Sequence, residues 1–519
     1  MQNSETDNFL SAGFGSYPAM IRHWGKVRPG AIAMRDMTRE LTWGELAGQV
    51  DRIAARLQET GLQRGQSVAI LGLSDIDYAL VFLAAIHAGG VAAPLTTSAS
   101  AAQLAAMAAD SGARHLFIDR AKLDELGSGF MPEMQHIILD EELAGWAAET
   151  AALAELFEPA PGDPFNIIYS SGTTGTPKGI VHNHAMRWFQ FAPTARAAYS
   201  PQAQALAATP LYSNTTMVAF LPAILAGACV NIMGRFSALG WLETAQRFGV
   251  THAMLVPVQY KRLMEEPRFG EYDLSSLALK YCTSAPFSAE LKAEVLRRMP
   301  GGLIEIYGMT EGGVTCLLYA HEHPDKLHTV GRPAPGGHAV KVLDDNDNQL
   351  PAGQAGQMVG ISPAMMAGYK NRPDATREAT WTDPADGSVW MRMGDIGRID
   401  ADGFVELVGR AKDVIISGGF NIYPIDLEQA LEKDARVAEA AVVGMPSEKW
   451  GETPVGFVRL EAGAGRDQVA SVLAETNAAL GKTQRLAALH ALDEMPRSHI
   501  GKLLKTDLRA LAAEIGGIA

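Results

Sequence analysis

One stretch of the chain, Tyr169–Gly179, carries the residue types that hold a polyphosphate. It reads Tyr-Ser-Ser-Gly-Thr-Thr-Gly-Thr-Pro-Lys-Gly and contains three glycines, five Ser or Thr hydroxyls and one lysine. Glycines let backbone N–H groups turn toward an anion, hydroxyls donate further hydrogen bonds, and the lysine adds a positive charge. The apolar, β-prone run Phe165–Tyr169 precedes it, so the sequence predicts a phosphate-binding loop that leaves a buried strand.

This loop differs from a Walker loop, whose pattern is G-x-x-x-x-G-K-[ST]. Pro177 stands where that pattern has its second glycine, and Gly179 replaces its magnesium-binding hydroxyl. The alternative is a flexible polar surface loop, but such loops rarely combine so many hydroxyls with a Pro-Lys-Gly exit from a buried strand. The sequence therefore favours a phosphate-binding loop of another kind.

A second segment, Glu305–Glu311, has side chains suited to a nucleotide and its metal ion. Tyr307 can stack on a flat base, and Gly308 allows a close approach of the backbone. Thr310 can bond a phosphate, and Glu311 offers a hard carboxylate oxygen to Mg²⁺. The alternative is a turn that exposes a glutamate, which the presence of the first loop disfavours.

These two segments resemble the signatures of the adenylate-forming superfamily. That superfamily includes acyl- and aryl-CoA synthetases, the adenylation domains of peptide synthetases and firefly luciferase. The resemblance covers roughly residues 20 to 510, with the main signatures in order. It implies an enzyme that joins ATP and a small carboxylic acid into an acyl adenylate with the help of Mg²⁺. The thiol of coenzyme A then takes the acyl group.

The resemblance also implies which residues bind ATP. A carboxylate at a strand end can accept both ribose hydroxyls, which suits Asp395. The Asp402-Gly403 pair that follows is a hairpin turn signal and leads to Arg410. The implied ATP-binding residues are Ser170, Ser171, Gly172, Thr173, Thr174, Gly175, Thr176, Pro177, Lys178, Ser284, Ala285, Pro286, Glu305, Ile306, Tyr307, Gly308, Met309, Thr310, Asp395, Arg410 and Lys502. Within the site, Lys502, Glu311 and Lys178 are the implied catalytic residues, and Glu311 and Ser170 are the implied metal ligands.

The C-terminal part resembles the small mobile domain of the same superfamily. Lys412 matches the hinge, so the resemblance implies a large domain over 1–411 and a small domain over 412–519 that rotates about it. Gly418 and Gly419 match residues that line the pantetheine tunnel of CoA, and Trp450 matches an aromatic residue beside it, although core packing is an alternative for this tryptophan. Lys502 ends a Pro-Arg-Ser-His-Ile-Gly-Lys segment that matches the loop of the catalytic lysine.

The residues that shape the acid pocket define the substrate only in part. The implied pocket residues are Tyr212, Ser213, Thr283, Ile306 and Gly308. The superfamily has an aromatic–histidine pair where this chain has Tyr212 and Ser213, which is a departure. Relatives that take malonate-like diacids have an arginine at the position of Ile306. An isoleucine cannot pair with a second carboxylate, so the sequence predicts a monocarboxylate with an apolar body.

Composition and charge exclude several classes of protein. The chain has 519 residues, is 47% hydrophobic and 20% charged, and carries a net charge of −14 with no basic run. This argues against nucleic acid and against an anionic membrane surface as partners. The polar, acidic N-terminus is unlike a signal peptide, and the three cysteines lack zinc or disulfide spacing, so the sequence predicts a cytoplasmic enzyme.

Alternating helical and strand-like segments predict an α/β fold with mostly parallel sheets in the large domain. Apolar strand patterns at 67–71 and 115–118 alternate with helical patterns at 41–57 and 101–111. The uncharged run Tyr78–Leu95 is near membrane-spanning length, but Gly89-Gly90 and Pro94 interrupt it, so we expect a buried helix, a turn and a strand, and no transmembrane segment. The small domain is predicted to be α+β.

Two rival functions remain open from the sequence. One is an acyl-AMP ligase that loads a carrier protein instead of CoA. Its amino-acid-activating branch is disfavoured because residues 212–216 contain no aspartate to hold an α-amine. The other is a non-catalytic nucleotide-binding relative, against which Lys502, Glu311 and Asp395 argue. The sequence leaves the oligomeric state open, with a homodimer as one option.

Overall fold

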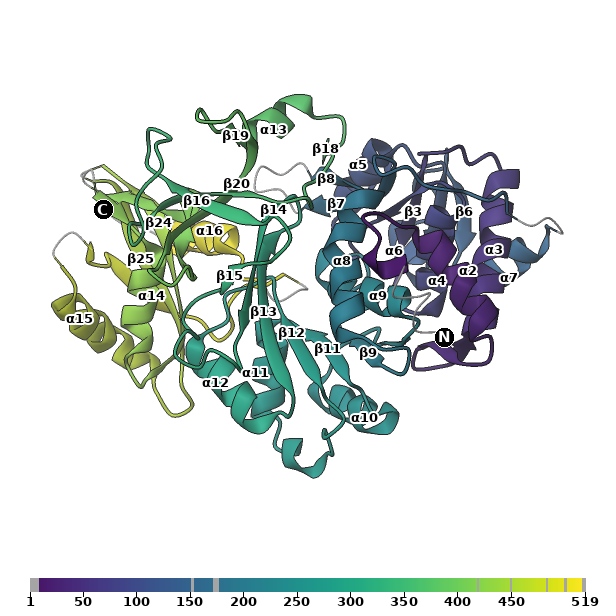
Figure 1. Cartoon of the computed structure of the whole chain (residues 1–519). Helices are drawn as coiled ribbons and strands as arrows, with labels where there is room; N and C mark the ends of the chain where they lie inside the picture. Colours follow the sequence, from purple (N-terminus) through teal and green to yellow (C-terminus); the bar gives the residue numbers. More distant parts are fainter. Residues whose placement is uncertain are drawn as a thin grey trace. The chain divides into compact units, whose positions relative to one another are not determined.

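The computed structural model describes residues 9–150, 154–170, 177–417, 420–448, 450–481, 484–498 and 502–515 (Figure 1). They form two compact units. The first comprises residues within 1–327, 333–339 and 361–391, and the second those within 328–332, 340–360 and 392–519. The division at Met391 and Arg392 precedes the expected boundary at 411 and 412. Both flanks of Lys412 therefore belong to the second unit.

The largest sheet has nine strands in the order β15-β14-β13-β12-β11-β9-β10-β1-β2. Its interior pairs, from β13 to β1, are parallel, whereas β14 is antiparallel to β13 and β2 is antiparallel to β1. The strands are β1 (Ile32–Arg35), β2 (Glu40–Thr42), β9 (Gln204–Ala207), β10 (Cys229–Ile232), β11 (His252–Leu255), β12 (Leu279–Cys282), β13 (Gly302–Met309), β14 (Gly312–Tyr319) and β15 (Arg332–Pro333). The expected parallel sheet is confirmed.

A second sheet of the first unit has seven strands in the order β18-β8-β7-β4-β3-β5-β6. The run from β7 to β6 is parallel, whereas β8 and β18 are antiparallel to their neighbours. The strands are β3 (Ser67–Leu71), β4 (Val91–Pro94), β5 (His115–Ile118), β6 (Gln135–Ile138), β7 (Pro164–Ser170), β8 (Lys178–Asn183) and β18 (Gly368–Tyr369). The phosphate-binding loop predicted from the sequence thus connects the antiparallel strands β7 and β8.

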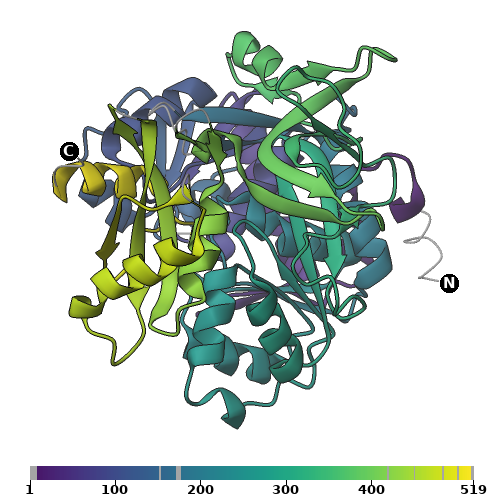
Figure 2. The ribbon, with the colours of Figure 1, turned by 90° about the vertical axis from the view of Figure 1, so that its left-hand side faces the viewer.

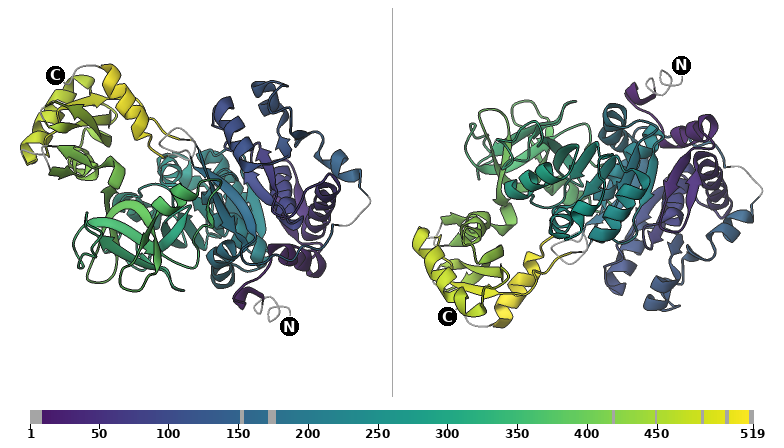
Figure 3. Two further views of the ribbon diagram at one scale, coloured as in Figure 1. Left: turned by 90° about the horizontal axis from the view of Figure 1, so that it is seen from above. Right: turned by 90° about the horizontal axis from the view of Figure 1, so that it is seen from below.

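Helices cover both faces of this seven-stranded sheet, as Figure 3 shows. The chain outside its second unit has α2 (Tyr17–Val27), α3 (Trp43–Glu59), α4 (Ile76–His87), α5 (Ala101–Ser111), α6 (Arg120–Leu126), α7 (Leu143–Ala148), α8 (His184–Ala198), α9 (Asn214–Ala226), α10 (Ala238–Phe248), α11 (Pro257–Glu265), η1 (Phe269–Glu271), α12 (Ala289–Arg298) and α13 (Pro373–Glu378). Helix α3 begins with a capping box, in which Thr42 and Glu45 bond each other's backbone N–H groups.

The uncharged run of the sequence folds as expected. Every residue of α4 except Asp77 is buried, and the chain then turns at Gly89, whose φ is +83°, into strand β4. In the part of the chain that the structure describes, no helix is long and apolar enough to cross a membrane. All three cysteines, Cys229, Cys282 and Cys316, are buried free thiols.

Two smaller sheets follow. One has the order β16-β17-β20-β19, with β21 beside β20, and the other the order β23-β22-β25-β24, with β26 beside β25. The elements are β16 (Ala339–Leu343), β17 (Gly356–Ile361), β19 (Thr380–Thr382), β20 (Val389–Ile399), β21 (Val405–Arg410), η2 (Ala411–Asp413), β22 (Ile415–Ser417), β23 (Phe420–Ile422), α14 (Pro424–Glu432), β24 (Val437–Ser447), β25 (Gly451–Leu460), η3 (Arg466–Gln468), α15 (Val469–Ala479), β26 (Ala488–Ala491) and α16 (Lys505–Ile515).

Helices accompany the paired strands β24 and β25 in the ribbon view of Figure 2, and side chains alternate between the two faces of such a pair. Val442 and Val458 pack with α14 and α15 on one face, whereas Val443 and Phe457 pack with α16 on the other. Helices therefore cover both faces of this sheet, and the second unit has a core of its own. This matches the α+β architecture expected for the small domain.

Gly227 joins three helices of the first unit. It follows α9 with a φ of +69°, and its carbonyl accepts hydrogen bonds from Arg28 Nη1 at 2.7 Å and Trp43 Nε1 at 3.1 Å. A Cβ at this position would lie 2.4 Å from the buried ring of Trp24. The position therefore requires glycine for two reasons, its backbone conformation and the space available.

We predict that Gly227→Ala destabilises the first unit by about 2–5 kcal/mol, because a left-handed conformation and an overpacked core both penalise alanine. Urea unfolding measures the loss. Gly249→Ala is the matched control, since Gly249 also ends a helix with a φ of +59° but has no atom within 4 Å of an added Cβ. It should lose only about 1–2 kcal/mol. Equal losses in the two variants would contradict the close packing at Trp24.

Candidate active site

The two flanks of the phosphate-binding loop are paired strand residues. Ser170 ends β7 and is opposite Lys178, the first residue of β8. Tyr169 is also fixed, since its hydroxyl lies 3.0 Å from Asp110 Oδ2. Pro177 is described and partly buried, whereas six predicted members of the loop lie outside the described residues: Ser171, Gly172, Thr173, Thr174, Gly175 and Thr176. The structure thus defines where the loop begins and ends.

Lys178 and Glu311 meet at a third residue, Tyr369, which sequence reasoning missed. The Nζ of Lys178 lies 5.0 Å from the centre of the Tyr369 ring, and the Tyr369 hydroxyl donates to Glu311 Oε1 at 2.8 Å. Burial is the main cause that raises the pKa of Tyr369, and the charge of Glu311 raises it as well. The Tyr369 hydroxyl therefore remains a donor at neutral pH. Tyr369 therefore holds the predicted metal carboxylate beside the predicted phosphate-binding lysine.

Glu311 has the properties of a magnesium ligand. Its Oε1 is held by Tyr369, and within the described ranges its Oε2 has no hydrogen-bond partner. Its backbone is fixed as well, because the Glu311 carbonyl accepts from Met366 N at 2.8 Å. Mg²⁺ commonly takes one or two carboxylates and completes its shell with phosphate oxygens and water. The described residues contain no cluster of three or more His, Cys, Asp or Glu side chains suited to a metal ion.

Glu305, which the resemblance places among the ATP-binding residues, directs its side chain into the interior. It is 5% exposed, and Lys292 Nζ lies 2.5 Å from its Oε2. Burial raises the pKa of Glu305 to about 7, and Lys292 opposes the shift. Any contact of Glu305 with a nucleotide is therefore expected through its backbone.

The predicted acid-pocket residues come together from three elements. Thr283, just after β12, donates from its hydroxyl to the carbonyl of Ile306 in β13 at 2.5 Å. Ser284 has a φ of +81°, and its hydroxyl bonds that of Thr215 in the first turn of α9. Ser213 caps α9 and directly follows the partly buried Tyr212.

One wall of this region is apolar. Ile306 is directly opposite Leu317 in the antiparallel pair β13–β14, and both side chains are partly exposed on the edge of the main core. Gly308 is two residues further along β13, where the register between β13 and β14 shifts between Tyr307 and Met309. A Cβ at Gly308 would have only ordinary contacts, at 3.4 Å or more, so this position has room for a ligand.

In the second unit, Asp395 and Arg410 are partners in one hairpin. They are directly opposite each other in β20 and β21, and Arg410 Nε lies 3.4 Å from Asp395 Oδ1. The turn between the strands has the predicted Asp402-Gly403 sequence, with a φ of +83° at Gly403. Lys412 follows in the short helix η2. The residues expected to hold ribose and to form the hinge are thus close in space.

Lys502 stands at the base of a loop, where three backbone pairings join residues 496–498 to residues 502–504. Leu504 N donates to the Pro496 carbonyl at 2.9 Å, Arg497 pairs with Leu503, and Ser498 N donates to the Lys502 carbonyl at 2.8 Å. Burial first, and the neighbouring charges of Arg410 and Lys412 next, lower the pKa of Lys502 to about 8, while Asp395 and Asp413 oppose this shift. Lys502 therefore belongs to the same charged cluster as Asp395 and Arg410.

The predicted CoA tunnel is described only at its edge. Gly418 and Gly419 lie outside the described residues. Trp450 is 49% exposed, which excludes simple core packing, the alternative for this residue in the sequence. Phe420 and Ile416, which flank the two glycines, are exposed as well. Apolar side chains on the surface at this place are consistent with a binding function.

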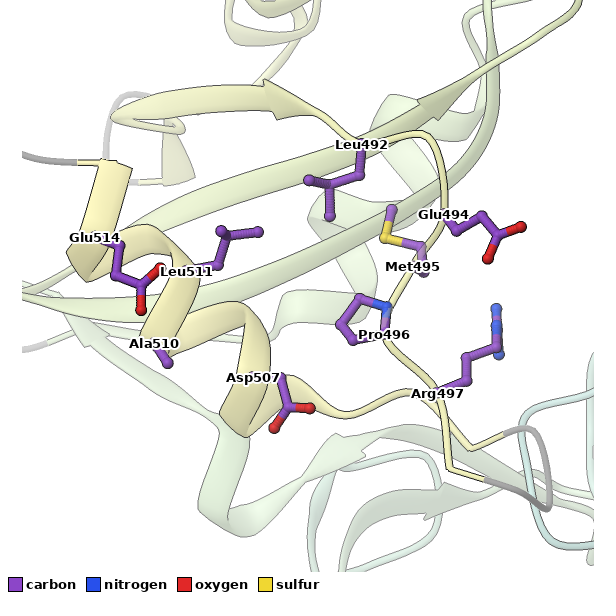
Figure 4. A pocket seen from close by; sticks show the side chains of 9 residues that line it. All are labelled: Leu492, Glu494, Met495, Pro496, Arg497, Asp507, Ala510, Leu511 and Glu514. Carbon is purple, nitrogen blue, oxygen red and sulfur yellow. The ribbon is translucent and has the colours of Figure 1, made fainter.

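A surface hollow of about 600 Å³ lies elsewhere on the second unit (Figure 4). It is formed between the 492–497 segment and helix α16, where Met495 and Leu511 supply apolar walls and Asp507 and Glu514 supply carboxylates. None of the residues predicted to bind substrates lines it. The hollow is therefore separate from the candidate site.

The fold and the arrangement of these residues define a class, the adenylate-forming ligases. The family described as AMP-binding enzyme matches residues 21–370, and the AMP-binding enzyme C-terminal domain matches residues 426–502. The chain belongs to the family of AMP-binding enzymes.

Three similar proteins illustrate the range of this family. Indoleacetate–CoA ligase from Aromatoleum aromaticum is 31% identical over 513 residues, which covers 95% of this chain and 97% of the relative. The fatty acid–[acyl-carrier-protein] ligase ScoC from Streptomyces coeruleorubidus is 31% identical over 491 residues, or 91% of each chain. The crystal structure of ATP-bound MatB from Rhodopseudomonas palustris is 26% identical, with a TM-score of 0.85 and coverage of 96% and 99%.

We predict that Tyr369→Phe raises the Mg²⁺ concentration needed for half-maximal activity by about tenfold, because groups that orient a metal ligand typically contribute this much to metal binding. The substitution removes the hydrogen bond to Glu311 and keeps the ring under Lys178. AMP release at fixed ATP and varied Mg²⁺ measures the effect. An unchanged Mg²⁺ dependence would show that Glu311 does not need Tyr369.

Proposed function

We propose that the chain is an ATP-dependent acid–CoA ligase. It activates a monocarboxylic acid as an acyl adenylate with release of pyrophosphate and transfers the acyl group to the thiol of CoA. The class of enzyme, an AMP-forming acyl- or aryl-CoA synthetase that uses ATP, Mg²⁺ and CoA, is supported by its family and by relatives named for CoA ligation. An enzyme of this kind works on a small-molecule acid and is expected in the cytoplasm.

The observation that carries the proposal is the contact of Lys178 and Glu311 with the same tyrosine. A lysine at the exit of a glycine- and hydroxyl-rich loop and a partly free carboxylate lie together beside Tyr369. A cation and a metal-binding carboxylate at one place suit a metal–polyphosphate better than they suit a neutral ligand. The acid-pocket residues Thr283 and Ile306 belong to the same unit, on and beside the strand that leads to Glu311.

In the proposed adenylation step, the substrate carboxylate attacks the α-phosphorus in line and pyrophosphate leaves. Negative charge develops on both sides of the phosphorus, and Lys178 and Lys502 stabilise it electrostatically. Mg²⁺, when bound, neutralises charge on the phosphate oxygens. Asp395 orients the ribose, with Arg410 beside it, and the residues around Ile306 orient the acid, so that positioning provides much of the remaining rate enhancement.

In the proposed second step, a domain over 412–519 rotates about Lys412 relative to residues 1–411. The rotation withdraws Lys502 and presents the segment around Gly418, Gly419 and Trp450 to the acyl adenylate. The thiol of CoA then attacks the carbonyl carbon, AMP leaves, and a thioester remains. The exposed apolar side chains around the two glycines support a role of this segment in binding the acceptor.

A carrier protein is the second candidate for the acyl acceptor. The similarity to ScoC supports it, because that relative is named for an acyl-carrier-protein acceptor. Both candidates share the adenylation step and differ only in the thiol. The non-catalytic alternative is disfavoured by the partly free Glu311 and by the grouping of Lys502 with Asp395 and Arg410.

The experiment that tests the function measures AMP formation from ATP with a panel of benzoates, phenylalkanoates, cyclic acids and aliphatic acids, each with and without CoA. We expect turnover that depends on CoA and on a monocarboxylic acid. Pyrophosphate exchange without any gain from CoA would instead identify a carrier protein as the acceptor.

The same panel tests the substrate class through Ile306→Arg. The variant should lose monoacid activity by about tenfold or more and gain activity with short diacids, because it places a charge in an apolar wall. Retained monoacid activity without any diacid activity would contradict the placement of Ile306 in the pocket.

We predict that Lys502→Ala lowers adenylation by roughly 10²–10³-fold, since it removes a charge that stabilises the transition state. Thioester formation from pre-made acyl-AMP and CoA should remain within about twofold, because Lys502 is expected to be withdrawn for that step. Separate assays of the two half-reactions measure this. In the unmodified enzyme, kcat/KM for ATP in adenylation should also fall as the pH rises through about 8, where Lys502 of the free enzyme loses its proton.

Lys505→Ala is the matched control for Lys502→Ala. Lys505 Nζ bonds Glu428 at 2.7 Å and the carbonyl of Val442 at 3.1 Å, so it has a structural role near the same loop. Both half-reactions should persist in this variant. Loss of both half-reactions in Lys502→Ala would contradict the scheme with two conformations.

A further inference from the structure

Arg187 in α8 is a fully buried cation whose acceptors are neutral. Its Nε donates to Asn166 Oδ1 at 2.9 Å, and its Nη2 bonds His182 Nδ1 at 2.9 Å. Its Nη1 donates to Gln190 Oε1 at 2.9 Å and to Asn214 Oδ1 at 2.8 Å. Burial lowers the pKa of Arg187 to about 9, so the guanidinium stays charged at neutral pH. Burial of such a charged group costs free energy. Two of its acceptors, His182 and Asn214, connect it to two parts of the candidate site.

Two chains of hydrogen bonds, here called arms, start at Arg187. The first arm runs through His182 to the turn that carries Glu311. A guanidinium can only donate, so His182 Nδ1 is the acceptor and the imidazole proton is on Nε2. That Nε2–H donates to the carbonyl of Thr310 at 2.8 Å. Burial, together with the charge of Arg187, lowers the pKa of His182 well below its usual value, which keeps the ring neutral. The charge of Arg187 thereby fixes the tautomer that holds the Thr310–Glu311 peptide.

The second arm runs to the acid-binding loop. Asn214 is the first residue of α9 and directly follows Tyr212 and Ser213, the predicted acid-pocket residues. Its amide oxygen is held by Arg187, whereas the next residue, Thr215, bonds Ser284. The arginine therefore fixes the start of α9 from the side of α8. One planar guanidinium can bond both His182 and Asn214, because its N–H donors point in different directions from a rigid group.

We propose that Arg187 is a positioning residue for adenylation, which fixes the Thr310–Glu311 turn through His182 and the start of the acid-binding helix through Asn214. This inference rests on the proposed function, since it assigns Arg187 to the same site. Arg187 does not touch the substrates in this scheme. It sets the relative placement of the metal carboxylate and the acid, which must be aligned for in-line attack.

The two arms have separate consequences, which makes the proposal testable by ATP–pyrophosphate exchange with the acid that gives the highest turnover. His182→Leu removes the first arm and should raise the half-saturating Mg²⁺ concentration by roughly tenfold, with the KM of the acid unchanged. Asn214→Ala removes the second arm and should raise the KM of the acid by roughly tenfold, with the Mg²⁺ dependence unchanged. Arg187→Met should raise both.

Two further variants separate positioning from stability. His182→Gln keeps an acceptor for Arg187 and a donor for Thr310 on one amide, so its Mg²⁺ dependence should stay within about twofold of the unmodified enzyme. Lys280→Met removes another fully buried cation of the first unit, which bonds the carbonyls of Pro300 and Gly301. It should lower the melting temperature and leave both constants within about twofold, because the hydrogen bonds of the Lys280 ammonium go to the Pro300–Gly301 turn and not to the two arms.

The proposal is overturned if Arg187→Met lowers only the melting temperature, or if His182→Leu and Asn214→Ala shift the two constants alike. If Arg187→Met does not fold, the two single-arm variants decide by the same criterion. In addition, the Arg187→Met/Asn214→Ala double variant should have the acid KM of Arg187→Met alone, and additive effects would count against a shared arm. Absence of exchange in the unmodified enzyme with every acid would overturn the proposed function itself, and the inference with it.

Discussion

The candidate site depends on hydrogen bonds between two sheets. Residues of the seven-stranded sheet fix the end of β13, a strand of the nine-stranded sheet. Glu311 follows β13 of the nine-stranded sheet, yet its partners come from the seven-stranded sheet and the segment that leads to it. Tyr369 of β18 binds its carboxylate, His182 of β8 binds the preceding carbonyl, and Met366 N binds its own carbonyl. Because Lys178 begins β8 and lies against the same tyrosine, phosphate-binding and metal-binding groups are placed by one set of contacts.

Arg187 and His182 make their contacts in the buried interior of the first unit. Burial strengthens their hydrogen bonds and also raises the free-energy penalty of leaving a polar group unpaired. Arg187 and His182 are fully buried, and an unpaired polar group there would cost several kcal/mol. The observed hydrogen bonds remove that penalty only when every member is present, so the network specifies one arrangement of β7, β8, α8 and α9. The site is thus supported by side chains that do not themselves face a ligand.

The sequence predicted those parts of the fold that are encoded locally. Hydrophobic patterning was sufficient to predict α4 and β4. The Asp402-Gly403 turn signal was sufficient to predict the hairpin that pairs Asp395 with Arg410. Tyr369 could not be found in this way, because its link to Glu311 joins positions 58 residues apart through tertiary packing. Arg187 did leave a signal, since a lone arginine in the apolar segment Ala185–Phe189 indicates a buried cation, but its acceptors are distant in sequence. The side chain of Glu305 faces inward because strand residues alternate, a constraint that a motif alone does not express.

The charge distribution explains how an acidic chain can bind a polyanion. With 44 Lys and Arg against 58 Asp and Glu, the overall field opposes ATP, so attraction has to be local. In the second unit, burial lowers the pKa of Lys502, the nearby charges of Arg410 and Lys412 lower it as well, and Asp395 and Asp413 offset part of this repulsion. Bringing an anionic ligand to such a cluster relieves the repulsion and raises the pKa of Lys502 again. The lysine is therefore most firmly charged when phosphate is present, which is the state in which its charge is needed.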